Sequence, residues 1–108
     1  MVTGQDPVEA VYLLKDYIVH THLKDGKMLK KAEPKRIYCD PSVEGAITNY
    51  ADYFMETPIG EGDVDFDKYV QALKDIGFDG FLTMEREAGD DPVEDIKSAK
   101  AYIEEKLG

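Results

Sequence analysis

Two short stretches of the chain, residues 17–25 and 80–87, carry the side chains that could do chemistry. Each begins with β-branched or aromatic apolar residues and ends in imidazole or charged groups. This pattern predicts two buried strands with polar side chains at their carboxyl ends. Ligands of α/β folds bind at that end, because the loops there line the open mouth of the sheet. Two strands with the same layout therefore indicate one site.

The best candidates in these stretches are His22 and Glu85. A neutral imidazole suits Zn²⁺, Mn²⁺, Co²⁺ or Fe²⁺, and a carboxylate could bind the same ion or act as a general base. His20 shares the strand face of His22, so it could support the site or be an ordinary structural histidine. One histidine and one glutamate are fewer than the three protein ligands of a typical catalytic metal site.

Charged residues flank this pair on both strands. Lys24 and Arg86 could bind hydroxyl or phosphate oxygens of a substrate. Asp25 could orient His22 or Lys24 from behind. For Lys24, Arg86 and Asp25, ion pairs within loops are the competing explanation. Glu87 shares the strand face of Glu85 and is expected to be a solvated charge at the rim.

The elements around the two stretches predict a single α/β domain over residues 1–108. Helices are expected to begin at Asp6 and Asp91, because an aspartate caps free N–H groups and the proline that follows suits the first turn. Another helix should begin at residues 63–65 and end at Gly77. Two strands separated by a helix should be parallel. On the last helix, these residues are expected to face the core: Val93, Ile96, Ile103 and Leu107.

Residues 26–59 form a long excursion between the first strand and the next helix. The apolar spacing from Val43 to Phe54 predicts a short amphipathic helix over about residues 41–54. A basic cluster opens the excursion: Lys27, Lys30, Lys31, Lys35 and Arg36. It could be a solvated loop or a surface that meets an anionic substrate. Connections this long usually have structure or function of their own.

The composition excludes several classes of partner. Thirteen basic and 23 acidic residues give a net charge of 13 − 23 = −10, which disfavours nucleic acids and anionic membranes. The single cysteine, Cys39, cannot form an internal disulfide and predicts a cytoplasmic location. The polar first residues do not read as a signal peptide, and no apolar run approaches the roughly 20 residues of a membrane helix.

Three motifs carry a family resemblance: His20-Thr-His-Leu-Lys-Asp25, Ile59-Gly-Glu-Gly-Asp-Val-Asp-Phe66 and Ile76-Gly-Phe-Asp-Gly-Phe-Leu-Thr-Met-Glu85. In this order they resemble the C-terminal part of the xylose isomerase-like TIM-barrel family, a group of sugar phosphate isomerases and epimerases. The resemblance runs from about Gly4 to Leu107. It implies the last (βα) units of a barrel, with about two parallel strands and three to four helices.

The same resemblance implies a divalent metal, either Mn, Zn, Co or Mg, with His22 and Glu85 as two of four ligands. It implies metal-assisted proton transfer next to the carbonyl of a sugar or sugar phosphate, with Glu85 as the catalytic group. A full barrel has eight strands and about 250 residues. The family's earlier glutamate and aspartate ligands have no match here.

We therefore expect a truncated or fragmentary isomerase- or epimerase-like protein. Two parallel strands alone leave unpaired edges and an uncovered face. The expected partner is a second copy of the chain, in a homo-oligomer, or a chain that supplies the missing strands. In a twofold assembly, two histidines and two glutamates from paired chains would complete the metal site. The alternative is a non-catalytic α/β module for oligomerisation, or half of a split protein.

Overall fold

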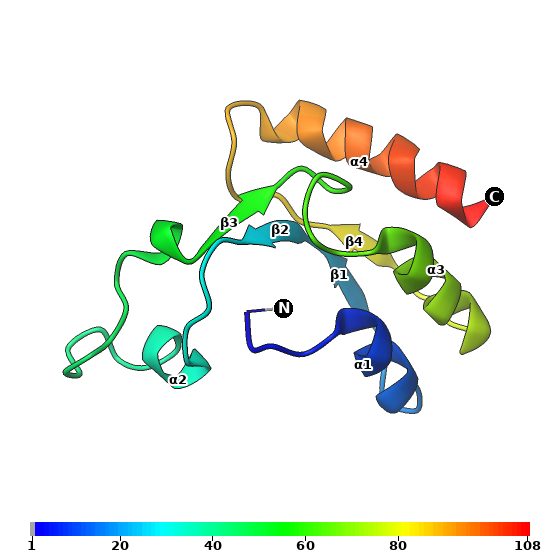
Figure 1. The fold of residues 1–108 in the computed structure, drawn as a ribbon. Helices are drawn as coiled ribbons and strands as arrows, with labels where there is room; N and C mark the ends of the chain where they lie inside the picture. Colours follow the sequence, from blue (N-terminus) through cyan, green and yellow to red (C-terminus); the bar gives the residue numbers. More distant parts are fainter. Residues whose placement is uncertain (1) are drawn as a thin grey trace.

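The computed structural model describes residues 2–108 (Figure 1). Its elements follow in this order: α1 (Pro7–Leu13), β1 (Thr21–Leu23), β2 (Asp25–Met28), α2 (Pro34–Ile37), the 3-10 helix η1 (Tyr50–Asp52), β3 (Phe54–Thr57), α3 (Phe66–Asp75), β4 (Leu82–Met84) and α4 (Pro92–Leu107). Strand β1 lies parallel to β4, and β2 lies antiparallel to β3. The predicted α/β class and the predicted parallel pair are confirmed.

The three longest helices begin where their aspartates predict. The carboxylate of Asp6 accepts hydrogen bonds from two amides in the first turn of α1, at 2.7 and 3.3 Å. Asp65 and Asp91 cap α3 and α4 in the same way, at 3.1 Å each. These bonds satisfy amides that have no partner within the helix. None of the helices in residues 2–108 combines the length and the apolar character that crossing a bilayer requires.

The core lies between the parallel strands and the helices. Leu23 of β1 is buried with Phe66 and Val70 of α3 and with Ile103 of α4. A second cluster joins α1 to α3 and consists of Val11, Ala72 and Leu73. Figure 1 shows α1, α3 and α4 gathered around the parallel pair. One face of β1 therefore packs on helices, and its other face carries the imidazoles.

Both strands of the parallel pair are shorter than predicted. Only three residues of each strand pair with the other, from Thr21 with Leu82 to Leu23 with Met84. Val19 and Phe81 precede the paired segments and are 87% and 80% exposed. The apolar run before each strand is therefore not part of a buried strand, because no neighbouring strand among the described residues pairs with it.

The core-facing side of α4 also differs from the prediction. Ala99 and Ile103 are buried, whereas Val93, Ile96 and Leu107 are exposed by 64%, 38% and 43%. The helix packs on α3 and β4. These two neighbours cover only a narrow stripe of the helix, so most of its apolar positions face away from the core.

The helix predicted over residues 41–54 is wrong. The carboxylate of Asp40 accepts hydrogen bonds from the amide and hydroxyl of Ser42, which fixes a turn. The chain then folds back, and the amide of Ile47 donates to the carbonyl of Arg36 at 2.7 Å. The end of the segment becomes η1 and then β3, which pairs with β2. Local turn bonds and strand pairing therefore override the helical spacing of the apolar residues.

Candidate functional site

The parallel pair places the predicted site residues on one face. His22 lies opposite Thr83 in the register, and the amide of Glu85 donates to the carbonyl of Leu23 at 3.0 Å. Thr21 and Leu23 are buried on the helix side, whereas His22 is exposed. Side chains alternate along a strand, so the imidazoles stand on the face that no helix covers. Glu85 follows β4 at its carboxyl end, where the sequence predicts it.

The structure brings His22 and Glu85 into contact. The Nδ1 atom of His22 lies 3.0 Å from Oε2 of Glu85. Thr83, the residue opposite His22, contacts the other histidine: its hydroxyl lies 2.9 Å from the Nε2 atom of His20. The two imidazole rings pack edge to face, with centroids 5.3 Å apart. His20 therefore supports the ring of His22 by contact, while it is bonded to a threonine and not to the glutamate.

The carboxylate of Glu85 is held in its anionic form. Hydrogen bonds from His22 and from Lys24, and the positive charge of Lys24, keep the pKa of Glu85 below its usual value. An ionised carboxylate accepts the hydrogen bond that Nδ1 of His22 donates. Anionic carboxylate and neutral imidazole are the forms that bind a divalent cation.

The pair fits two positions of a metal site. Two donors about 2.1 Å from one ion are roughly 3.0 Å apart in octahedral coordination and 3.4 Å apart in tetrahedral coordination. The Nδ1 to Oε2 separation of 3.0 Å agrees with this range, and an ion bound by both atoms would take the place of the proton that Nδ1 donates. In residues 2–108, however, no three His, Cys, Asp or Glu side chains are grouped so that they could hold an ion. The described residues therefore provide two donors of an incomplete set.

Lys24 extends the site along the same face. Its ammonium group lies 3.3 Å from Oε1 of Glu85 and 3.1 Å from Oε2 of Glu56, and it also bonds to Glu87. Burial acts to lower the pKa of Lys24, but the hydrogen bonds that its ammonium group donates to Glu87, Glu56 and Glu85 outweigh it and raise the pKa above its usual value. Lys24 is therefore a permanent cation beside Glu85. Glu87, predicted as a solvated rim charge, is one of its partners.

Arg86 does not lie open to a ligand. Its side chain is 8% exposed, with Nε 2.7 Å from Asp95 of α4 and Nη1 2.9 Å from Glu56 of β3. The hydrogen bond to Asp95 is the main cause that raises its pKa. The predicted substrate-binding role thus gives way to the competing ion-pair explanation. Arg86 ties the segment after β4 to α4 and to β3.

Glu56 is the residue of this network that the sequence did not reveal. Its Oε1 atom accepts hydrogen bonds from Arg86 and from the amides of Glu87 and Ala88, at 2.9, 2.9 and 3.2 Å. Burial acts to raise its pKa, but these bonds and Lys24 outweigh it and lower the pKa to about 2. Glu56 lies 29 positions before Glu85 in the sequence, within the segment predicted as helix and loop. Only the pairing of β3 with β2 brings it here.

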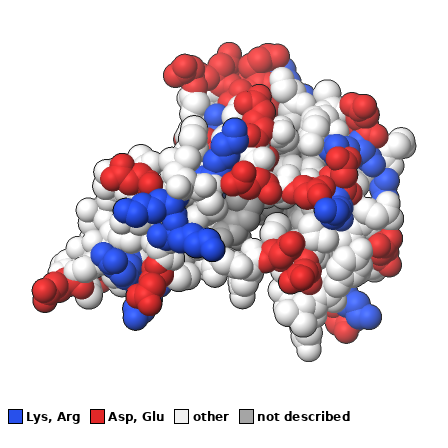
Figure 2. All heavy atoms as spheres, in the orientation of Figure 1, with Lys and Arg blue, Asp and Glu red and all other residues white. Residues whose placement is uncertain are grey.

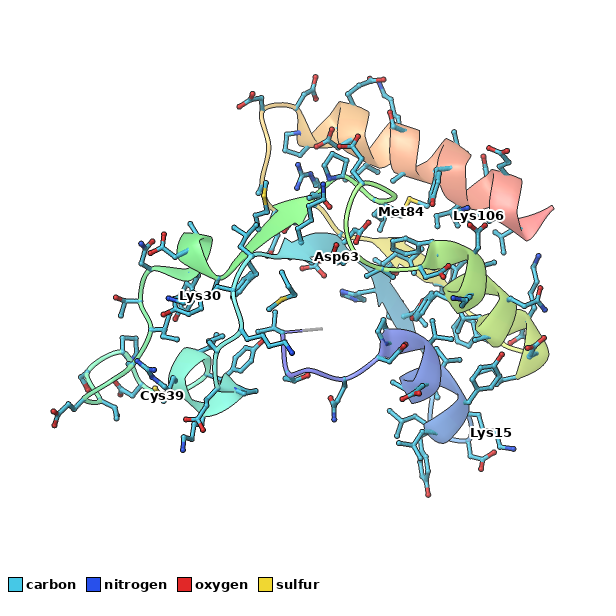
Figure 3. The ribbon with its side chains drawn as sticks, viewed as in Figure 1. Lys15, Lys30, Cys39, Asp63, Met84 and Lys106 are labelled. Carbon is cyan, nitrogen blue, oxygen red and sulfur yellow. The ribbon has the colours of Figure 1, made fainter. Side chains whose placement is uncertain are left out.

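Asp25 has a different role from the one predicted. Its side chain is buried and accepts hydrogen bonds from the amides of Gly60 and Gly62, both at 2.9 Å, and of Val64 at 3.2 Å. The loop is also joined to β2 by Asp63, whose carboxylate accepts from the amide of Met28 at 2.8 Å (Figure 3). Asp25 therefore anchors the glycine loop before α3 instead of orienting His22 or Lys24.

A cavity of about 490 Å³ adjoins this network. Its charged side is formed by Lys24, Glu56 and Glu87, and its apolar side includes Tyr38 and Phe54. The volume lies in the range of small-molecule sites, which are mainly apolar with a few polar groups. The cavity could hold a ligand whose end reaches Lys24 and, through it, the neighbourhood of Glu85.

Comparison with known proteins identifies the family of the chain. The family model of the xylose isomerase-like TIM barrel matches residues 1–106. Inosose dehydratase of Clostridium perfringens strain 13 is 32% identical over 96% of the chain and 34% of its own length. Inosose dehydratase of Lacticaseibacillus casei is 28% identical over the same shares.

A solved structure shows the same fold. The xylose isomerase domain protein of Planctomyces limnophilus superposes with a TM-score of 0.67 and 27% identity, over 97% of this chain and 33% of that protein. The chain thus spans about a third of the length of the relatives that it matches. The match of the family model to nearly every residue shows that the chain belongs to the xylose isomerase-like TIM barrel family.

Proposed function

We propose that the chain contributes two ligands, His22 and Glu85, to a divalent-metal site that moves a proton next to the carbonyl of a sugar, a sugar phosphate or an inosose. The observation that carries this proposal is the 3.0 Å contact between the imidazole and the anionic carboxylate at the carboxyl ends of neighbouring parallel strands. The names of the relatives support the substrate class, since two of them act on an inosose.

The proposed chemistry assigns one task to each residue. His22 and Glu85 would hold the divalent ion, which would supply Lewis-acid polarisation of a carbonyl oxygen and so acidify the neighbouring C–H group. Glu85 takes the proton from that carbon and returns it, because its carboxylate is anionic and each of its two oxygens accepts only one hydrogen bond. Lys24 stabilises the negative charge that develops on a substrate oxygen. Isomerisation, epimerisation and loss of water beside a carbonyl share this first proton transfer.

The missing ligands must come from outside residues 2–108. The supporting features are the incomplete donor set and the uncovered face that carries His22, whose side chain is 58% exposed. A second copy of the chain, or a chain that supplies further barrel strands, would cover this face. We place the site in the cytoplasm, because a chain whose sole cysteine is Cys39 requires no oxidising compartment.

A specific observation favours the non-catalytic alternative. Both carboxylate oxygens of Glu85 already have partners, Oε2 in His22 and Oε1 in Lys24. If the chain is not catalytic, these bonds serve to hold the two strand ends together, and the chain is an α/β module for oligomerisation or half of a split protein. The two functions differ in whether a metal ion competes successfully for the carboxylate.

Calorimetric titration with Mn²⁺ separates them. The native chain is expected to bind the ion, and His22→Ala and Glu85→Ala are expected to lose that binding. The matched control is Glu105→Ala, which removes an exposed glutamate of α4 and should bind as the native chain does. Absence of binding at millimolar Mn²⁺, or equal binding by all variants, would overturn the metal-site proposal in favour of the module.

A further inference from the structure

The segment between β2 and β3, residues 29–53, projects from the body of the molecule; we call it the arm. Figure 1 shows α2 and η1 on the far side from α1, α3 and α4. The radius of gyration is 15.2 Å and the extents are 47 × 34 × 19 Å, whereas a compact chain of this length has a radius of about 13 Å. Among the described elements, α2 makes no extensive contact with another helix or strand. Apart from the contacts of η1 with the adjacent β3, the described elements of the arm therefore make no extensive contact with the body.

The surface of the arm is apolar as well as extended. Ile37 and Ile47 are buried within the arm, with 5% and 6% exposed, and hold its loop closed. Leu29, Tyr38 and Val43 are 54%, 65% and 53% exposed. A projecting segment with a small core and exposed large apolar side chains is typical of a surface that another macromolecule covers.

The start of the arm and its base carry a charge opposite to that of the body. Residues 27–36 contain five basic residues and one acidic residue, a net charge of 5 − 1 = +4. The arm as a whole is balanced, because residues 29–53 contain four basic and four acidic residues, whereas the body outside residues 27–53 carries 8 − 19 = −11. Figure 2 shows blue side chains grouped over the start of the arm, and red ones at its far end, over the start of α4 and along the body. The basic surface and the acidic surface belong to the same chain and lie at different places on it.

Most cations of the arm and its base have no ionic partner among the described residues. In the described chain, ion pairs are formed by most of the body's cations, such as Lys24, Arg86 and Lys106. On the arm and its base, only Lys35 has a carboxylate within 4 Å, that of Glu33. The remaining ones have none among residues 2–108: Lys27, Lys30, Lys31 and Arg36. In Figure 3, Lys30 stands on the arm, far from Lys106 on the body.

We propose that the basic start of the arm, residues 27–36, docks on the acidic body of a second copy of this chain. A second copy is the partner because every copy of the chain carries both the basic segment and an acidic body, so the two surfaces are present at equal concentration. A nucleic acid is disfavoured because a chain of net charge −10 repels it. In a twofold dimer each arm contacts the other body, so the contact is formed twice. An arm of 53 − 29 + 1 = 25 residues has the size of one side of a stable interface. This inference requires neither the metal nor the proposed chemistry.

Sedimentation equilibrium of the metal-free chain tests the proposal. The native chain should form a dimer, and the double variant Lys30→Glu/Lys31→Glu should weaken the dimer at least tenfold. Tyr38→Ser should weaken it as well, without unfolding the chain, because the ring is exposed. The matched control is Lys97→Glu/Lys100→Glu, which reverses two exposed charges of α4 and should not weaken the dimer, because it makes the body more acidic.

Carbodiimide cross-linking of an equal mixture of ¹⁵N-labelled and unlabelled chain identifies the surfaces. Amide links between Lys30, Lys31 or Lys35 of one isotope and body carboxylates of the other are expected. A monomer at all concentrations, a dimer indifferent to the arm variants, or links confined to other surfaces would overturn the proposal. Tight binding of a single-stranded RNA oligomer, lost in Lys30→Glu/Lys31→Glu, would also overturn the proposal, because the arm would then bind a nucleic acid. Because no metal is present, failure here leaves the metal-site proposal standing.

Discussion

The Nδ1 atom of His22 and the Oε2 atom of Glu85 lie 3.0 Å apart, although 63 positions separate the two residues in the sequence. The parallel register of β1 and β4 produces this contact, because it places the two strand ends side by side. Lys24 completes the arrangement from the same face, 3.3 Å from the other oxygen of Glu85. The acid–base behaviour of Glu85 should therefore depend on both neighbours.

Replacing either neighbour should raise the pKa of Glu85. In the native chain, the hydrogen bonds from His22 and Lys24 stabilise the anion and lower that pKa. His22→Gln and Lys24→Met each remove one source of stabilisation, so titration of Glu85 should move toward higher pH. The measurement is a pH titration of the side-chain carboxyl by ¹³C NMR. A native Glu85 that titrates like the glutamates of an unfolded chain would contradict the contact.

Replacing Glu56 by glutamine should destabilise the fold and change its acid dependence. The variant removes one of the two carboxylates that bind the guanidinium of Arg86, whose side chain is only 8% exposed. This loss should lower the free energy of unfolding by about 2–4 kcal/mol at pH 7. Urea denaturation measures this loss. The matched control is Glu61→Gln on an exposed loop residue, which should change stability by less than about 0.5 kcal/mol.

The pH dependence supplies a second check on Glu56. Its pKa falls from an ordinary value of 4.5 to about 2 on folding, so the stability it contributes is complete above about pH 4.5 and is lost as the pH falls toward 2. The fall corresponds to roughly 3 kcal/mol at most. The native chain should lose stability over this range more steeply than Glu56→Gln does. Parallel pH curves for the two proteins would show that the carboxylate is not held as the contacts indicate.

Adding a methyl group at Gly62 should disturb the loop before α3. A Cβ atom at this position would lie inside the van der Waals radius of the Asp25 carboxylate, which is fixed by three loop amides. Gly62→Ala should therefore lower the free energy of unfolding by roughly 2–4 kcal/mol in urea denaturation. Gly77→Ala is the comparison: it has φ of +69° and open space around its Cβ, so only about 1 kcal/mol of backbone strain is expected. Equal losses for both would indicate that Asp25 can move aside.

The sequence by itself determined the features that depend on neighbouring residues or on strand periodicity. The aspartates at the helix starts cap the amides beside them, so Asp6 and Asp91 could be assigned without a structure, and the cap of α3 could be narrowed to Asp63 or Asp65. Side-chain alternation along the predicted strand placed His20 and His22 on one face. Two strands joined through a helix had to be parallel, and that topology brought His22 to Glu85.

Only the tertiary structure decided the contacts that join distant segments. The pairing of β2 with β3 carries Glu56 to Arg86, and the fold of the glycine loop gives Asp25 three amides that lie 35 to 39 positions away. Both outcomes depend on where the excursion returns to the body. Apolar spacing does not encode that return, because the turn at Asp40 and the backbone bonds of a two-stranded pair determine it. The arm projects for the same reason: a sequence pattern describes the face of an element, whereas its neighbours in space determine whether that face is covered.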